Sequence, residues 1–148
     1  MYNNIMTAVT RKLDVLFPNV TIYEGGVEQG LIEPCFFVGF LEPSEKPLLG
    51  HRYFRSTGMS IQYMSGEVEQ PARELNRVLD ILMESMEYLP LADGSLMRGT
   101  KRSGEPKDGV LNFFINYDRF GKRIGKTEES MENITVKRKE YDYGRKNE

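Results

Sequence analysis

Apolar and polar side chains alternate with a period of two along residues 52–64 and 110–118 of this chain. Successive side chains of a β-strand point to opposite faces, so the alternation predicts two strands that each bury one face. The residues predicted to face the core are Tyr53, Thr57, Met59, Ile61 and Tyr63 in the first strand and Leu111, Phe113, Ile115 and Tyr117 in the second. A fold for this chain must therefore contain a sheet with one covered face.

Two segments with helical periodicity are predicted to cover that face. Residues 3–17 carry apolar side chains at spacings of three and four, and Pro18 ends the pattern. Residues 71–89 begin with Pro71, which a helix tolerates in its first turn, and end before Pro90. The apolar stripe of this second helix consists of Leu75, Val78, Leu79, Leu82, Met86 and Leu89.

Shorter patterns predict the remaining strands and their connections. Residues 20–24 form a short β-rich run, and residues 35–41 are apolar at both alternate sets of positions, which predicts a central strand covered on both faces. A loop is expected over 42–50. Residues 96–103 are predicted to pair with 110–118 through turn residues at 104–109, and 131–136 is expected to form a further short strand.

These elements predict an α+β fold in the order helix, three strands, helix, two strands. The expected sheet is antiparallel or mixed, has about five strands and is flanked by the two helices. The length of 148 residues fits one domain. We place this domain at 1–125, and we expect the polar tail at 126–148 to become ordered only in an assembly.

The distribution of charge points to a charged partner. Residues 1–94 contain 7 Lys/Arg against 13 Asp/Glu, whereas residues 95–148 contain 13 against 9. An acidic body with a basic C-terminal third suits self-association or docking to another protein, although two solvated faces would give the same pattern.

Catalytic, metal and cofactor sites are not indicated by the residue types present. The chain has a single cysteine, Cys35, and a single histidine, His51, which excludes an intrachain disulfide and argues against a zinc site. A small enzyme using Cys35 and His51 is a remote alternative, because a cysteine in an apolar strand is usually inert. No cofactor fingerprint is present, and the glycines of 121–126 lack the spacing of a phosphate-binding loop.

No membrane association is expected, and the chain is expected to be cytoplasmic when it is made. The longest apolar run, 35–41, is far shorter than the roughly 20 residues needed to span a bilayer. The first residues also lack the basic start and apolar stretch of a signal peptide.

A nucleic-acid interface is weakly indicated by basic residues that interleave with aromatic residues, a composition that can contact phosphates and stack on bases. Most of these aromatics are assigned to the core by alternation, and the pI is about 5.6. We therefore expect at most non-specific contact with DNA. The residues concerned are His51, Arg52, Arg55, Arg98, Lys101, Arg102 and Lys107, with Tyr53, Phe54 and Tyr117.

Three blocks of sequence, at 27–37, 49–55 and 97–118, resemble tail terminator proteins of long-tailed phages and of prophage-like elements in Gram-positive bacteria. The resemblance implies an α+β structural protein rather than an enzyme. It implies a ring, typically a hexamer, that caps the finished tail tube, stops its polymerisation and provides a docking surface for the head–tail connector protein. The implied partners are further copies of the chain, the tail tube protein and the connector. The implied location is the head-proximal end of the tail in the virion, after assembly in the bacterial host cytoplasm.

A ring requires one patch of a subunit to meet a different patch of its neighbour. Our hypothesis is that a set of basic residues meets an acidic face of the next subunit or of the tube, unless these charges are merely solvated. An alternative role on the same fold is a head-completion, connector or other minor tail subunit. The proposed interface residues are Arg52, Arg55, Arg98, Lys101, Arg102 and Lys107.

Overall fold

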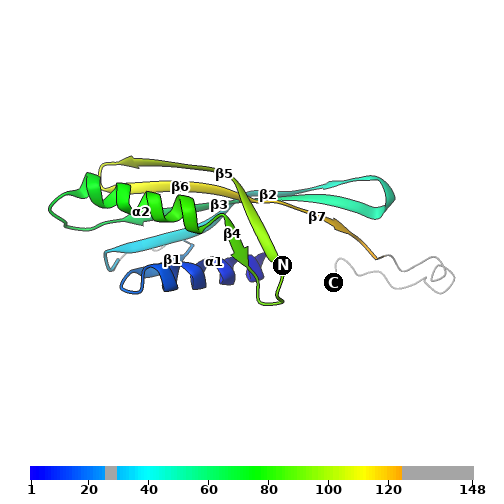
Figure 1. Ribbon diagram of the computed structural model, residues 1–148, viewed down its shortest axis with the longest axis horizontal. Coiled ribbons are helices and arrows are strands. Elements are labelled where there is room, and N and C mark those ends of the chain that lie inside the picture. The colour runs from blue at the N-terminus through cyan, green and yellow to red at the C-terminus, as the bar shows by residue number, and fades with distance from the viewer. Residues whose placement is uncertain (26–29, 125–148) are drawn as a thin grey trace. The chain divides into compact units, whose positions relative to one another are not determined.

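A mixed seven-stranded sheet forms the centre of the fold in the computed structural model, which describes residues 1–25 and 30–124 (Figure 1). The strand order is β1-β2-β3-β6-β5-β4, and β7 pairs with β3 off this path. The strands are β1 (Thr21–Glu24), β2 (Cys35–Pro47), β3 (Arg52–Met64), β4 (Tyr88–Pro90), β5 (Leu96–Lys107), β6 (Val110–Tyr117) and β7 (Arg119–Lys122).

The pairing is parallel at one edge of the sheet and antiparallel in its centre. β1 pairs with β2 in parallel, from Thr21 opposite Cys35 to Glu24 opposite Val38. β6 pairs antiparallel with β3 and with β5, and a register shift between Thr100 and Ser103 interrupts the second pairing. β4 extends the sheet beyond β5 with three antiparallel pairs.

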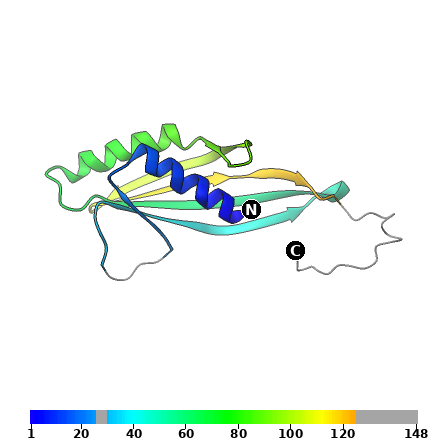
Figure 2. The same ribbon diagram turned by 90° about the horizontal axis from the view of Figure 1, so that it is seen from below.

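Two helices cover one face of this sheet, as Figures 1 and 2 show. Helix α1 (Tyr2–Leu16) buries Ile5, Val9 and Leu13, which recur at a spacing of four. Helix α2 (Pro71–Ser85) begins with its proline in the first turn, where the missing N–H removes no intrahelical hydrogen bond. Both helices contribute to one hydrophobic core, so each is held by packing of its apolar stripe.

The core-facing side of the sheet follows the predicted alternation. Ile61 of β3 lies opposite Phe113 of β6, and both side chains are fully buried. On the outer face Gln62 donates a 2.6 Å hydrogen bond to Asn112. Burying a large apolar side chain of this kind contributes about 1.5–3 kcal/mol, which explains why one face is apolar and the other is polar. The residues of β3 and β6 that were predicted to face the core are all buried, apart from Tyr53, which is half-buried.

The described residues divide into two compact units. The first unit comprises Met1–Glu45 and Arg55–Arg119, and every buried residue of the described chain belongs to it. The described part of the second unit comprises Lys46–Phe54 and residues 120–124. It contains the short 3-10 helix η1 (Leu49–His51) and none of its described residues is buried.

The predicted α+β class and the order of the main elements are confirmed. The sheet has seven strands rather than about five, because β4 and β7 are not among the predicted strands. Four further local predictions are wrong. Helix α2 ends at Ser85 rather than near 89, because the chain turns to form β4 and the Gly99 N–H donates to the Glu87 carbonyl. β2 continues through the predicted 42–50 loop to Pro47, since it stays beside β3. β5 likewise continues through the predicted 104–109 turn to Lys107, which leaves a two-residue turn at 108–109.

The fourth wrong prediction concerns the coverage of β2. Phe36 and Val38 are buried beneath the helices, but Phe37 and Gly39 on the other face are only half-buried. Phe37 stacks on Tyr23 with ring centroids 5.4 Å apart, so a neighbouring strand provides this shielding instead of a second layer. The predicted 131–136 strand, the domain boundary at 125 and the polar tail at 126–148 lie outside the described residues.

Candidate subunit-interaction surfaces

The first half of β5 presents three of the predicted basic residues on the first unit. Arg98 and Lys101 are exposed, whereas Arg102 is half-buried. Lys101 has a positive φ of 52° and lies within the irregularity that separates Thr100 from Ser103. Such a bulge re-aims the side chains of a strand, so Lys101 and Arg102 do not follow a regular alternation.

Gly99 brings this part of β5 close to the end of α2. A Cβ atom at Gly99 would lie 2.3 Å from Ile115 Cδ1 and 3.1 Å from the Met86 carbonyl oxygen. The Gly99 N–H donates a 2.6 Å hydrogen bond to the Glu87 carbonyl. The Tyr117 hydroxyl, opposite Gly99 in the register, donates to the Met86 carbonyl at 2.6 Å. The absence of a side chain at Gly99 therefore allows the basic strand to dock on the core.

Glu87 links two of the basic side chains. Its two carboxylate oxygens lie 3.4 Å from Arg98 Nη2 and 3.4 Å from Arg102 Nη1. Arg102 also donates a 2.7 Å hydrogen bond to the Met83 carbonyl, in the last turn of α2. A cation at a helix C-terminus satisfies exposed carbonyls and complements the helix dipole, so Arg102 has a role inside the subunit.

The other three predicted basic residues lie elsewhere. Arg55 donates from Nε and Nη2 to Glu45 Oε1, at 3.1 and 2.7 Å, and its Nη1 contacts the Met1 sulfur. Arg52 belongs to the second unit, where its Nε donates to the Leu49 carbonyl at 3.1 Å. Lys107 is exposed at the end of β5 farthest from Arg98, a separation of about 30 Å along an extended strand. Only Arg98, Lys101 and Arg102 are thus neighbours on one stretch of strand.

The residues of the remote enzymatic alternative do not form an activated nucleophile. Cys35 is fully buried at the start of β2, and burial, with a smaller contribution from Glu33, raises the pKa of its thiol. A raised pKa disfavours the thiolate, which is the reactive form. His51 is exposed in the second unit. Within residues 1–25 and 30–124, no group of three or more His, Cys, Asp or Glu residues is arranged to hold a metal ion.

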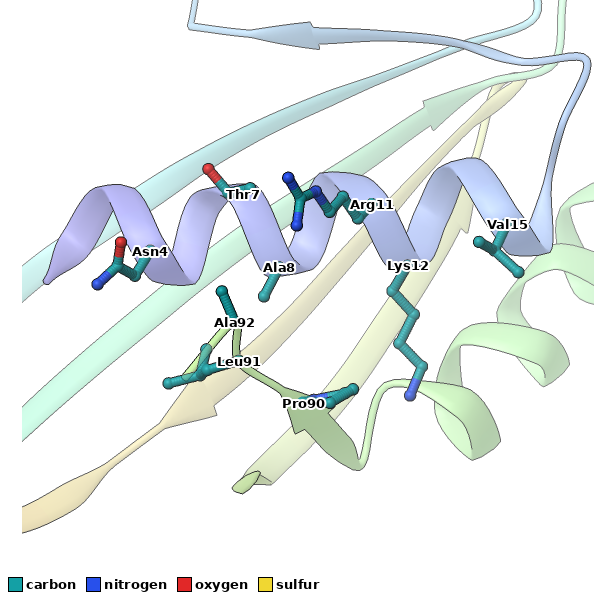
Figure 3. A pocket seen from close by; sticks show the side chains of 9 residues that line it. All are labelled: Asn4, Thr7, Ala8, Arg11, Lys12, Val15, Pro90, Leu91 and Ala92. Carbon is teal, nitrogen blue, oxygen red and sulfur yellow. The ribbon is translucent and has the colours of Figure 1, made fainter. Parts of the chain in front are cut away.

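A pocket of about 580 Å³ lies between α1 and the segment that follows β4, as Figure 3 shows. Apolar lining comes from Ala8, Val15 and residues 90–92, and the cationic Arg11 and Lys12 add positive charge. The Lys12 ammonium donates a 2.6 Å hydrogen bond to the Tyr88 carbonyl, and burial lowers the pKa of Lys12. The sequence reasoning did not identify this pocket, because its lining comes from two segments about 80 residues apart in the chain.

The sequence reasoning also missed exposed apolar residues in the second unit. Leu49, Phe120 and Ile124 are 84 %, 72 % and 94 % exposed. Their sequence signal is weak. Phe120 and Ile124 are single apolar residues between polar or glycine neighbours, and Leu49 follows just one other leucine. Such short apolar segments are common at protein surfaces. Across the described parts of the chain, no helix is long and apolar enough to cross a membrane.

Comparison with known proteins gives one informative match. A family model described as phage tail terminator protein matches residues 4–131. No curated protein matches the chain. One solved structure, titled only by a sequence identifier, is 11 % identical and covers 84 % of this chain and 97 % of its own, with a TM-score of 0.43. A likeness at that level carries no argument about function.

Proposed function

Because this chain belongs to the phage tail terminator protein family, we propose that it forms a ring that caps the tail tube and stops its polymerisation. In this proposal the ring lies at the head-proximal end of the tail and provides the docking surface for the head–tail connector protein. The match to the family model carries the proposal, since it spans all three blocks of sequence that resemble tail terminators.

Family membership shows that the chain is a structural component of a phage tail rather than an enzyme. The buried thiol of Cys35 agrees with this role, because a sulfur without solvent access serves packing rather than nucleophilic chemistry. The chemistry of this chain is therefore that of protein–protein contact.

We place one side of the subunit contact at the basic stretch of β5. Arg98 and Lys101 are exposed, and exposed charges steer association and set orientation between subunits. Arg102 donates a hydrogen bond to the last turn of α2 and so fixes β5 to this helix inside the subunit. In the proposal Arg55 and Lys107 are outlying members of this contact, whereas Arg52 belongs to the second unit and contributes separately. The neighbour's contribution would come from the first unit, which carries 16 Asp/Glu against 10 Lys/Arg.

A stable interface buries about 800 Å² on each partner, which two or three side chains do not supply. The contact must therefore extend beyond Arg98 and Lys101. Exposed neighbours on the same edge of the first unit include Tyr88 of β4, which lies opposite Arg98, and Leu96 at the start of β5. These two apolar side chains are suited to the centre of an interface whose charged residues form the rim.

Tail length in cells that produce tails without this protein tests the proposed function. We expect tubes that extend beyond the normal length, because no ring would end polymerisation. Electron microscopy of the released tails measures the length distribution, and supplying the intact chain from a second gene copy should restore it. Tails of normal length that lack heads would contradict termination and favour the connector alternative.

Charge reversal tests the interface. We expect Arg98→Glu with Lys101→Glu to abolish ring formation, because two exposed carboxylates would then repel an acidic neighbour. Ring formation is measured by light scattering of the purified chain and by the presence of the chain on isolated tails. Arg102 is left unchanged, since its guanidinium holds the Met83 carbonyl.

Arg11→Glu with Arg73→Glu is a charge-matched control on the exposed surfaces of α1 and α2. The control should assemble normally. Equal assembly of both double variants would overturn the assignment of β5 as the contact, and equal failure would show that only overall charge matters.

A further inference from the structure

The described part of the second unit is a small piece of β-structure. Its described residues, 46–54 and 120–124, include the end of β2, the start of β3 and most of β7, and none of them is buried. Strands that bury none of their residues completely are only marginally stable in water, because they bury too little apolar surface to offset the ordering of the backbone. Such an element normally gains stability from a surface that covers it.

Contacts within the second unit nevertheless hold it in a defined conformation. The rings of Phe54 and Phe120 lie 4.8 Å apart, and the Arg123 guanidinium lies 4.9 Å from the centre of the Tyr53 ring. The Arg123 N–H donates to the His51 carbonyl at 2.8 Å. These contacts join β7 to the start of β3.

Gly121 contributes to the same fit. A Cβ atom at this position would lie 2.2 Å from Tyr53 Cζ, so the glycine allows the tyrosine ring to lie directly on β7. A strand pair that is packed this closely presents a fixed surface to a partner, and the partner does not have to order it first.

Apolar side chains on this fixed surface point to solvent. Ile124 and Leu49 are the two most exposed large hydrophobic residues of the described chain, and Phe120 is 72 % exposed. Exposed apolar residues gathered in one small element are typical of interaction sites. The charged Lys, Arg, Asp and Glu residues in the described part of this unit are all positive, because residues 46–54 and 120–124 contain four Lys/Arg and no Asp/Glu.

We propose that the second unit docks on the acidic first unit of a second copy of this chain. Charge complementarity identifies the first unit of a second copy as the partner. The first unit has six more acidic than basic residues, whereas the docking surface is basic and apolar. The contact is heterologous and can therefore propagate from subunit to subunit and close into a ring. This inference rests on the proposed ring, and it adds a second, largely apolar contact to the β5 surface.

Site-specific photo-crosslinking tests this docking in assembled tails. A benzophenone amino acid replaces Leu49 or Ile124 in the full chain, which is produced together with the other tail proteins. We expect an adduct of about twice the 17.1 kDa of one chain on denaturing gels, with its crosslinked peptides in residues 1–45 or 55–119. The same probe at Val68, a partly exposed residue of the first unit, serves as the control and should give little adduct.

Adducts formed only with the tube or connector protein would overturn the proposal, and so would the absence of any adduct. Neither result bears on the proposed function, which is tested by tail length. A second measurement replaces Leu49 and Ile124 together by serine, with Val68→Ser as the control. We expect self-association to weaken by about tenfold or more, with unchanged circular dichroism because no buried residue is altered. Unchanged self-association would equally contradict the docking.

Discussion

Gly99→Val is expected to lower the free energy of unfolding by about 3 kcal/mol, at the upper end of the cost of overpacking a core. A Cβ atom alone would lie 2.3 Å from Ile115 Cδ1, 2.8 Å from Ile115 Cγ1 and 3.1 Å from the Met86 carbonyl oxygen. Ile115 is 1 % exposed and cannot move into solvent. The strand must therefore move away from α2, which weakens the hydrogen bond from Gly99 to Glu87. Urea unfolding of the purified chain measures the change.

A double-mutant cycle identifies the cause of this loss. Ile115→Val removes the Cδ1 atom that a Cβ at position 99 would meet, so Gly99→Ala should cost less when combined with Ile115→Val than alone. Gly39→Ala is a matched control, because a Cβ there meets no atom within 4 Å. We expect the control to change stability by less than about 1 kcal/mol. An uncoupled Gly99→Ala and Ile115→Val pair would contradict this account.

The sheet and helices could be predicted from the sequence because their burial is periodic. The alternation of Met59, Ile61 and Tyr63 requires one covered face, and the same residues are buried in the structure. The end of α2 could not be predicted, because Met86 and Leu89 continue the helical spacing of its stripe and are both fully buried. Met86 enters the core from the turn after α2, and Leu89 enters it from β4. Both positions bury an apolar side chain as well as another helical turn would.

The candidate site was predicted less completely than the fold. Arg98 and Arg102 are equivalent in the sequence, yet one is exposed and the other donates to the last turn of α2. The difference arises from the bulge after Thr100, which no local pattern of residues announces. The apolar surface of the second unit was missed for another reason. Leu49 and Ile124 lie 75 residues apart in the chain, and only the pairing of β7 with β3 brings their segments into one unit.

The structure connects the core with the proposed β5 contact. The carbonyls of Met83, Met86 and Glu87 accept hydrogen bonds from Arg102, Tyr117 and Gly99, respectively. All three acceptors lie at the end of α2 or just beyond it. The orientation of Arg98 and Lys101 is therefore supported by a part of the molecule whose stability can be measured without the assembly.

Tyr117→Ala tests that support and is expected to destabilise the first unit by about 3–5 kcal/mol, the usual cost of removing a buried aromatic ring. Tyr117 is fully buried, and its hydroxyl donates to the Met86 carbonyl at 2.6 Å. Burial raises the pKa of this phenol, so the donor proton is retained at neutral pH. The pKa of the phenol is higher in the folded state than in the unfolded state. The stabilisation that the protonated phenol provides is therefore complete below its ordinary pKa of about 10 and is lost as the pH rises further.

Tyr117→Phe distinguishes the contribution of the aromatic ring to stability from that of the hydroxyl. The phenylalanine keeps the packing and leaves the Met86 carbonyl without its donor, so we expect a loss of about 1–3 kcal/mol, smaller than that of alanine. If the core holds the basic strand in place, Tyr117→Ala should also reduce the amount of chain found on isolated tails, at a temperature where Tyr117→Phe remains folded and assembles. Equal stability of the two variants would show that the aromatic ring of Tyr117 contributes little to stability. Normal assembly of a Tyr117→Ala chain that is measurably destabilised would show that the β5 contact does not depend on the core beneath it.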